Sequence, residues 1–241
     1  MRYAIISDVH ANLEALEAVL REIDSLAADK ILCLGDVVGY GANPNECTEI
    51  IRDRSCVTLL GNHDHAATGG TSIEWFNPHA RAAILWTKDV LRADCTEFLK
   101  NLPYTASIDG AYLVHANPSE PESWNYIFEP TEALYEFRCF GQSVCFIGHS
   151  HFALYFVKEG RSCRAALPTT FTLEQNKRYI VNVGSVGQPR DHISAASFAT
   201  LDLPEGVVEF HRVEYDRRLA YEKILDAGLP RFLAERLLVG E

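Results

Sequence analysis

The stretch Val57-Thr58-Leu59-Leu60-Gly61-Asn62-His63-Asp64 joins a short apolar run to a cluster of polar residues. Four other apolar runs end in the same way, in an aspartate or a histidine. These are 3–7 before Asp8-Val9-His10, 31–35 before Asp36, 111–114 before His115, and 144–148 before His149-Ser150-His151. Short apolar runs bounded by turn residues are typical of buried β-strands. The sequence therefore predicts five strands that each end in a side chain able to bind a metal ion.

The segments around these runs favour an α/β fold with two sheets. Leu13, Leu16, Leu20 and Ile23 recur at helical spacing between the first two runs, and a strand–helix–strand unit places its two strands parallel in one sheet. From residue 152 onward, turn signals separate the apolar runs 154–157, 180–183, 198–201 and 207–210. This pattern predicts an antiparallel meander that forms a second sheet. The expected architecture is a mixed two-sheet β-sandwich flanked by helices.

We expect a single domain over residues 1–241. Residues 66–103 contain a glycine-rich loop and two helical segments, and strands of the same core flank them. They are therefore interpreted as a helical insertion over the sheet. Two further helices are expected over residues 217–238. A hydrophobic content of 47% is enough for a sizeable core.

Composition narrows the classes of partner. The net charge of -11 argues against a nucleic acid or an anionic membrane as the main partner, because both require a basic surface. No apolar run approaches the roughly 20 residues that span a bilayer, and the first strand begins too early to leave room for a signal peptide. Seven cysteines, an odd number without a Cys-x-x-Cys motif, favour the reducing cytoplasm. A homo-oligomer is left open.

The polar strand ends form a set of oxygen and nitrogen donors without cysteine. Such a set suits divalent Mn, Fe, Zn, Ni or Co. It exceeds what one ion needs, whereas two ions roughly 3.5–4 Å apart that share one carboxylate would use all of it. The seven candidate ligands are Asp8, His10, Asp36, Asn62, His115, His149 and His151.

This donor set predicts phosphoester hydrolysis. Two ions can bridge a water, lower its pKa and hold a phosphoryl oxygen, so that the hydroxide attacks phosphorus. His63, next to a candidate ligand, suits the general acid that protonates the leaving group. Asp64 either orients His63 or caps the following turn. Asn62, Asn117 and Arg190 are the candidate substrate-binding residues.

The motifs Asp8-x-His10, Gly35-Asp36, Gly61-Asn62-His63-Asp64, His115 and Gly148-His149-x-His151 occur in the order of the calcineurin-like metallophosphoesterase superfamily, which the chain resembles over most of its length. The resemblance implies a four-layer fold with the metals at one edge of two sheets. It also implies that Asp36 bridges the two ions and that His63 is the general acid. The implied ligands are Asp8, His10 and His151 for the first metal, and Asn62, His115 and His149 for the second.

Differences from the protein phosphatases of that superfamily narrow the choice of subfamily that the chain resembles. Those enzymes carry an arginine soon after the bridging aspartate and a glutamate after the Asn-His pair. In this chain, residues 36–41 read Asp-Val-Val-Gly-Tyr-Gly without an arginine, and Asp64 follows His63. The chain is more similar to small bacterial and archaeal phosphodiesterases, including a longer subgroup with the loop 182–190. A small phosphorylated substrate is expected. The alternatives are a protein Ser/Thr phosphatase-like activity and a metal-binding scaffold for protein contacts.

An aromatic loop is the last candidate feature. Trp124, Tyr126 and Phe128 lie within residues 119–130. They form either a wall of the substrate site or a lid that packs on the sheet.

Overall fold

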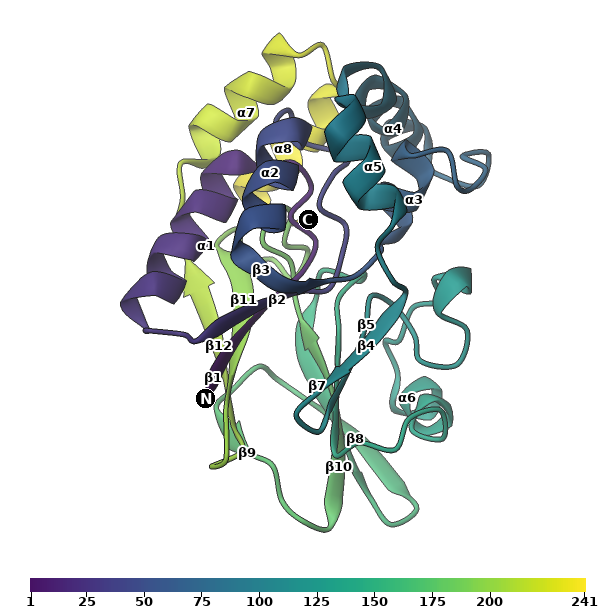
Figure 1. Ribbon diagram of the computed structural model, residues 1–241, viewed down its shortest axis with the longest axis vertical. Helices are drawn as coiled ribbons and strands as arrows, with labels where there is room; N and C mark the ends of the chain where they lie inside the picture. Colours follow the sequence, from purple (N-terminus) through teal and green to yellow (C-terminus); the bar gives the residue numbers. More distant parts are fainter.

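Twelve strands form two six-stranded sheets that pack face to face in the computed structural model, which describes residues 1–241 (Figure 1). The first sheet contains, in spatial order, β3 (Ser55–Thr58), β2 (Lys30–Cys33), β1 (Arg2–Ile6), β11 (Ala196–Asp202), β12 (Val207–Val213) and β9 (Phe171–Thr172). The second contains β4 (Thr105–Ile108), β5 (Ala111–Val114), β6 (Val144–Ile147), β10 (Lys177–Val183), β7 (Ala153–Glu159) and β8 (Ser162–Ala166).

Both sheets are mixed, and their parallel pairs set the direction of the site. In the first sheet β1, β2 and β3 are parallel, as the sequence predicts for the first two. In the second sheet β5, β6 and β10 are parallel. Parallel neighbours end at the same edge of a sheet, so the polar residues that follow these strands lie together.

Side-chain alternation along β1 explains the layers. Ala4 and Ile6 face one cluster of buried residues, which includes Leu16 and Ile23 of a covering helix. Tyr3 and Ile5 face the opposite way and pack against residues of the second sheet. Successive residues of a strand point to opposite faces, so this central strand is buried on both sides.

The helices form the outer layers. Most of them lie in the upper half of Figure 1, whereas α6 covers the outer face of the second sheet. Their bounds are α1 (Leu13–Ser25), α2 (Pro44–Arg54), α3 (Asn62–Ala67), α4 (Pro78–Val90), α5 (Ala93–Lys100), α6 (Pro130–Glu136), α7 (Arg217–Asp226) and α8 (Arg231–Val239), with a 3₁₀ turn η1 (Pro121–Ser123). None of these helices is both long enough and apolar enough to cross a membrane.

The prediction that the strands after residue 152 form a sheet of their own is wrong. β7 and β10 join β6 in the second sheet, whereas β11 and β12 extend the first sheet from β1. An alternating pattern identifies a strand, but its partner depends on which buried faces meet in the folded chain. The sequence patterns also did not predict α3, β8 or β9. The first is a single short helix, and the other two are short strands that are largely exposed.

Candidate metal centre

The ends of the two sheets meet around Asp8. The main-chain N–H of His149, which follows β6, donates to Asp8 Oδ2 after β1 at 3.0 Å. A Cβ added to Gly148 would collide with Ser7 and Asp8. Glycine is therefore needed where one strand end crosses the other, and this contact joins the donors of both sheets.

A first group of donor atoms consists of Asp8, His10 and His151. The Nε2 atoms of His10 and His151 are 3.0 Å apart. Asp8 Oδ1 lies 3.3 Å from His151 Nε2 and 3.8 Å from His10 Nε2. All three side chains are buried. The three atoms converge closely enough to bind one cation.

A second group consists of Asp36, His115 and His149. His115 Nε2 lies 3.4 Å from Asp36 Oδ2 and 4.0 Å from Asp8 Oδ1. Asp36 Oδ2 is also 3.7 Å from His10 Nε2 in the first group. The carboxylate of Asp36 thus faces donors of both groups.

Main-chain carbonyl oxygens orient three of the imidazoles. The Nδ1 atoms donate at 2.6–3.1 Å, from His10 to Val38, from His115 to Leu34 and from His151 to Gln188. A ring whose Nδ1–H is held in this way presents the lone pair of Nε2. Each of these Nε2 atoms faces the centre of the cluster.

Several buried atoms at this point have no hydrogen-bond partner. They are Asp8 Oδ1, Asn62 Oδ1, His115 Nε2 and His149 Nε2. An unpartnered buried polar atom costs about 1–3 kcal/mol. Unpartnered acceptor atoms beside converging donor groups are expected where cations bind, so the residues fit a metal centre.

The electrostatics agree with a cationic ligand. Burial alone would raise the pKa of Asp36, but His115 and His63 outweigh it and hold this pKa well below its ordinary value. Burial opposes the charge of His115, yet Asp36 and Asp8 raise its pKa to about 9. Burial lowers the pKa of His149 to about 3. Ionised carboxylates therefore face imidazoles in the buried cluster.

Many of these ligand positions have a left-handed backbone. The φ angles are 54° at Asp8, 49° at His10, 53° at Asp36, 66° at His149 and 63° at His151. Such conformations cost about 1–3 kcal/mol each for residues other than glycine and concentrate at functional sites. No sequence signal marked these five positions as strained.

His63 borders the cluster and forms a further group of converging donor atoms with His10 and Asp36. Its ring centroid is 4.9 Å from that of His10 and 4.4 Å from that of Tyr40, and Nδ1 is buried without a partner. The carboxylate of Asp64 accepts from the main-chain N–H groups of Val38 at 3.0 Å and Gly61 at 3.2 Å. Of the two roles considered for Asp64, these bonds match the cap at the start of α3. The pKa of Asp64 is raised to about 7 by burial and by Asp36.

The candidate substrate-binding residues lie in different surroundings. The buried amide of Asn117 donates to Ser119 Oγ at 3.0 Å and accepts from Asn125 N at 2.9 Å, so it fastens the aromatic loop. The guanidinium of Arg190 lies over the ring of Tyr40, 5.5 Å from its centroid. The ring of Tyr40 therefore contacts both Arg190 and His63.

Aromatic side chains enclose the approach to the cluster. A cavity of about 420 Å³ is lined by Asn62, His63 and His149 together with Tyr40, Trp75, Phe76, Asn77, Ala80, Trp124 and Tyr126. The ring of Tyr126 stacks on His149, with centroids 4.2 Å apart and planes at 19°. Of the two roles considered for the aromatic loop, Trp124 and Tyr126 match the wall. The sequence analysis did not identify Tyr40 as a residue of this cavity, although its place in a Gly-Tyr-Gly turn after Asp36 is a signal that could have done so.

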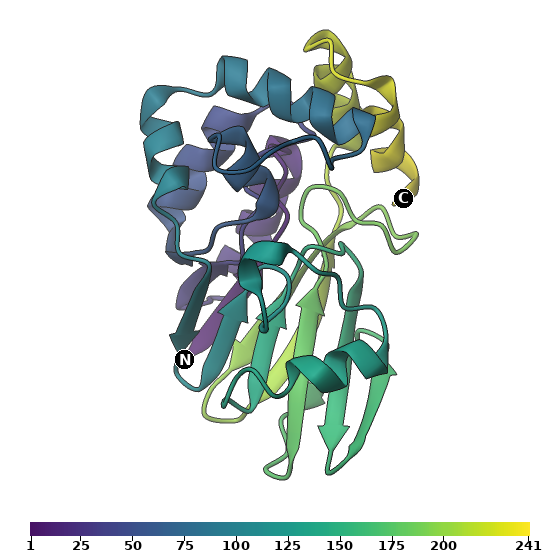
Figure 2. The same ribbon diagram turned by 90° about the vertical axis from the view of Figure 1, so that its right-hand side faces the viewer.

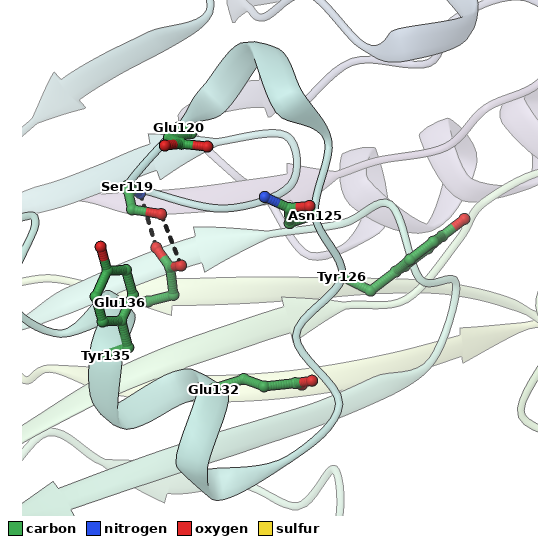
Figure 3. A pocket seen from close by; sticks show the side chains of 7 residues that line it. All are labelled: Ser119, Glu120, Asn125, Tyr126, Glu132, Tyr135 and Glu136. Atoms are coloured by element: carbon green, nitrogen blue, oxygen red, sulfur yellow. Dashed lines mark hydrogen bonds between the residues drawn. The ribbon is translucent and has the colours of Figure 1, made fainter. Parts of the chain in front are cut away.

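A larger cavity of about 590 Å³ lies beside the same loop, between it and α6 (Figure 3). Two of its three acidic side chains accept hydrogen bonds from the loop itself. Glu136 accepts from the N–H of Ser119 at 2.7 Å and from its hydroxyl at 2.8 Å, and Glu132 accepts from the N–H of Phe128 at 2.7 Å. Figure 3 shows Tyr126 pointing away from Glu136. No histidine lines this cavity, so the candidate chemistry belongs to the smaller one.

Known proteins share both the sequence and the fold. The family model of the calcineurin-like phosphoesterase superfamily domain matches residues 1–206. The uncharacterized protein MJ0912 of Methanocaldococcus jannaschii is 44% identical over 98% of this chain and 97% of its own length. A metallophosphoesterase from Sphaerobacter thermophilus is 40% identical, with a TM-score of 0.90 over 100% of this chain and 99% of that one. The hypothetical protein PH1004 from Pyrococcus horikoshii OT3 shares the fold, with a TM-score of 0.78 at 20% identity, covering 100% of this chain and 98% of that one.

Two mixed sheets whose adjoining ends gather buried aspartates and histidines define a protein of the metallophosphoesterase type. The chain belongs to the calcineurin-like phosphoesterase superfamily.

Proposed function

We propose that this chain hydrolyses a phosphodiester or a small phosphorylated metabolite with the help of two divalent ions. One observation carries the proposal: two groups of three buried donors adjoin where Asp36 Oδ2 lies 3.7 Å from His10 Nε2, and four acceptor atoms around them lack a hydrogen-bond partner. Asp8, His10 and His151 would hold one ion, and Asn62, His115 and His149 the other, with Asp36 between them. When bound, ions of the Mn, Fe, Zn, Ni or Co type would supply an activated water and neutralise phosphoryl charge.

The remaining roles belong to side chains around the aromatic cavity. His63 lines this cavity and would give a proton to the oxygen of the leaving group. Burial lowers the pKa of His63 to about 4, so the proton would be held only while the imidazole faces negative charge, such as that of Asp36 or of a bound phosphate. Asp64 would act indirectly, by fixing the start of α3 and hence the position of His63. Arg190 would bind a phosphate oxygen. Trp124 and Tyr126 would hold an apolar or aromatic part of the substrate against the wall.

We further propose that the chain is a single domain that works in the cytoplasm on small substrates. All seven cysteines are free, which agrees with a reducing compartment. The net charge of -11 disfavours a nucleic-acid backbone as the main partner.

The test combines an activity screen with a matched pair of histidine variants. Purified protein supplied with each metal should cleave bis(p-nitrophenyl) phosphate, and lack of turnover with every metal would favour a metal-binding scaffold instead. His63→Asn should keep its metals yet slow the cleavage of alkyl esters about 10²–10⁴-fold, the usual weight of general acid catalysis. The control is His65→Asn, because His65 belongs to none of the donor groups. Equal loss in both variants, or none in His63→Asn, would remove His63 from the acid role.

A further inference from the structure

Two arginine side chains share one neutral oxygen near the candidate site. Arg190 Nη2 donates to Gln188 Oε1 at 2.9 Å, and Arg236 Nη1 approaches the same oxygen at 3.3 Å. The two guanidinium groups therefore lie side by side, although they carry the same charge.

No aspartate or glutamate side chain lies within ion-pair distance of either guanidinium. Arg236 Nε donates to the main-chain oxygen of Glu241, and Arg190 Nε is buried without a partner. Arg212, by contrast, is neutralised by Asp191. Burial and the neighbouring Arg190 lower the pKa of Arg236 to about 10. Glu241 offsets part of the charge of Arg236, but two guanidinium groups that share one neutral acceptor repel each other, and an anion between them would relieve this repulsion.

This pair lies next to the candidate metal centre. The main-chain oxygen of Gln188 accepts from His151 Nδ1, so the segment that carries the shared amide also orients a candidate ligand. Arg190 covers Tyr40, whose ring centroid is 4.5 Å from that of His10. The ring of Tyr40 therefore contacts both Arg190 and the donor cluster.

The C-terminal helix α8 holds Arg236 in this position. Leu237 and Leu233 are buried in a cluster that also includes Tyr40, and the N–H of His192 donates to the main-chain oxygen of Gly240 at 2.9 Å. Figure 2 shows the C-terminal helices beside the loop that follows β10. The match to the superfamily domain ends at residue 206, so Arg236 comes from a segment outside that domain.

We propose that Arg190, Arg236 and the amide of Gln188 form an anion subsite that binds a second phosphate group of the substrate. This inference rests on the proposed function, because it assigns the first phosphate to the metal centre. Guanidinium groups bind phosphate through paired charge-assisted hydrogen bonds, and the unpartnered Nε of Arg190 supplies one free donor. The substrate class is therefore a small metabolite that carries two separate phosphate groups.

The experiment compares ligands that differ by one phosphate. Calorimetric titrations of the full-length, metal-loaded protein would use thymidine 3′,5′-bisphosphate against thymidine 5′-monophosphate, and fructose 1,6-bisphosphate against fructose 6-phosphate. At least one pair should bind with a preference of about tenfold or more for the bisphosphate, the weight expected of one hydrogen bond between charged groups. Arg236→Gln should reduce that preference to near unity.

Arg231→Gln is the matched control on the same helix, because Arg231 is exposed and pairs with Glu235. It should keep the full preference, and Arg236→Lys should keep part of it. A preference that is absent in the wild type, or unchanged in Arg236→Gln, would overturn the subsite. Binding and turnover are separate measurements, so an inactive protein that still shows the Arg236-dependent preference would contradict the proposed hydrolysis and leave the subsite standing.

Discussion

Replacement of Asp36 by asparagine should release both metal ions. Asp36 Oδ2 lies 3.7 Å from His10 Nε2 and 3.4 Å from His115 Nε2, so it faces one histidine of each donor group. Its Oδ1 accepts from the N–H of His63 at 2.8 Å, a bond that the amide oxygen of asparagine can keep. The change therefore preserves shape but turns an NH₂ group toward two imidazole nitrogens and removes one negative charge.

The size of the effect follows from the position of Oδ2. Loss of a partner that merely supports a ligand weakens metal binding about 10–100-fold. Asp36 would contact the ions directly and contribute a formal charge, so the loss should exceed about 100-fold for each ion. A protein with micromolar metal affinity would then leave gel filtration with less than one ion per chain.

Elemental analysis after gel filtration, together with manganese titration by calorimetry, would measure this loss. Glu136→Gln is the matched control, because Glu136 is a buried carboxylate that binds Ser119 and lies in none of the donor groups. Circular dichroism would verify that both variants are folded. Two ions retained at wild-type affinity would refute the bridging role, and the loss of only one ion would assign Asp36 to a single group.

Two further predictions concern stability. Removal of the metals with EDTA should lower Tm by roughly 5–10 °C. An ion present at 100 times its Kd stabilises the fold by about 2.7 kcal/mol, and the Tm of a chain of this length shifts by roughly 2–4 °C per kcal/mol. An unchanged calorimetric Tm would contradict metal binding by the native fold. Gly148→Ala should destabilise the protein by about 1–3 kcal/mol in urea unfolding, because its Cβ would meet Ser7 and Asp8. Gly141→Ala is the control, since an added Cβ there meets no atom within 4 Å, and equal midpoints for the two variants would argue against the close approach of the strand ends.

The fold was predictable as far as each strand carries its own signal. The apolar runs before Asp8, Asp36 and His115 correspond to β1, β2 and β5, and the helix between the first two runs makes their pairing parallel. The later strands carry the same alternation whichever sheet they join. The pairing of β11 with β1 buries Phe198 against α1 and Ala199 against the second sheet, a choice that depends on both faces at once. Local patterns therefore determine the strands, whereas the division between the two sheets follows from tertiary packing.

The candidate site was predictable where chemistry-bearing residues sit in short motifs. The seven ligand candidates lie together, as their positions after parallel strands require. Asn117 and Asp64 show the limit of this reasoning, because their hydrogen bonds go to the loop around Asn125 and to the main chain of Val38. Arg236 shows the opposite limit. It lies on an amphipathic helix far along the chain, and only tertiary packing of Leu237 brings it to Gln188.

The left-handed backbone at the ligands has a consequence for metal binding. Five strained residues cost several kcal/mol together, at about 1–3 kcal/mol each. Hydrogen bonds between strand ends support this geometry: His10 N–H donates to the main-chain oxygen of Asp36 at 2.9 Å, and the Ser185 hydroxyl donates to that of Asp8 at 2.8 Å. We therefore expect the same hydrogen bonds to keep the donors in place when the ions are removed. Small domains that fold only around zinc unfold when it is removed, whereas here EDTA should shift Tm by several degrees and leave the two sheets intact.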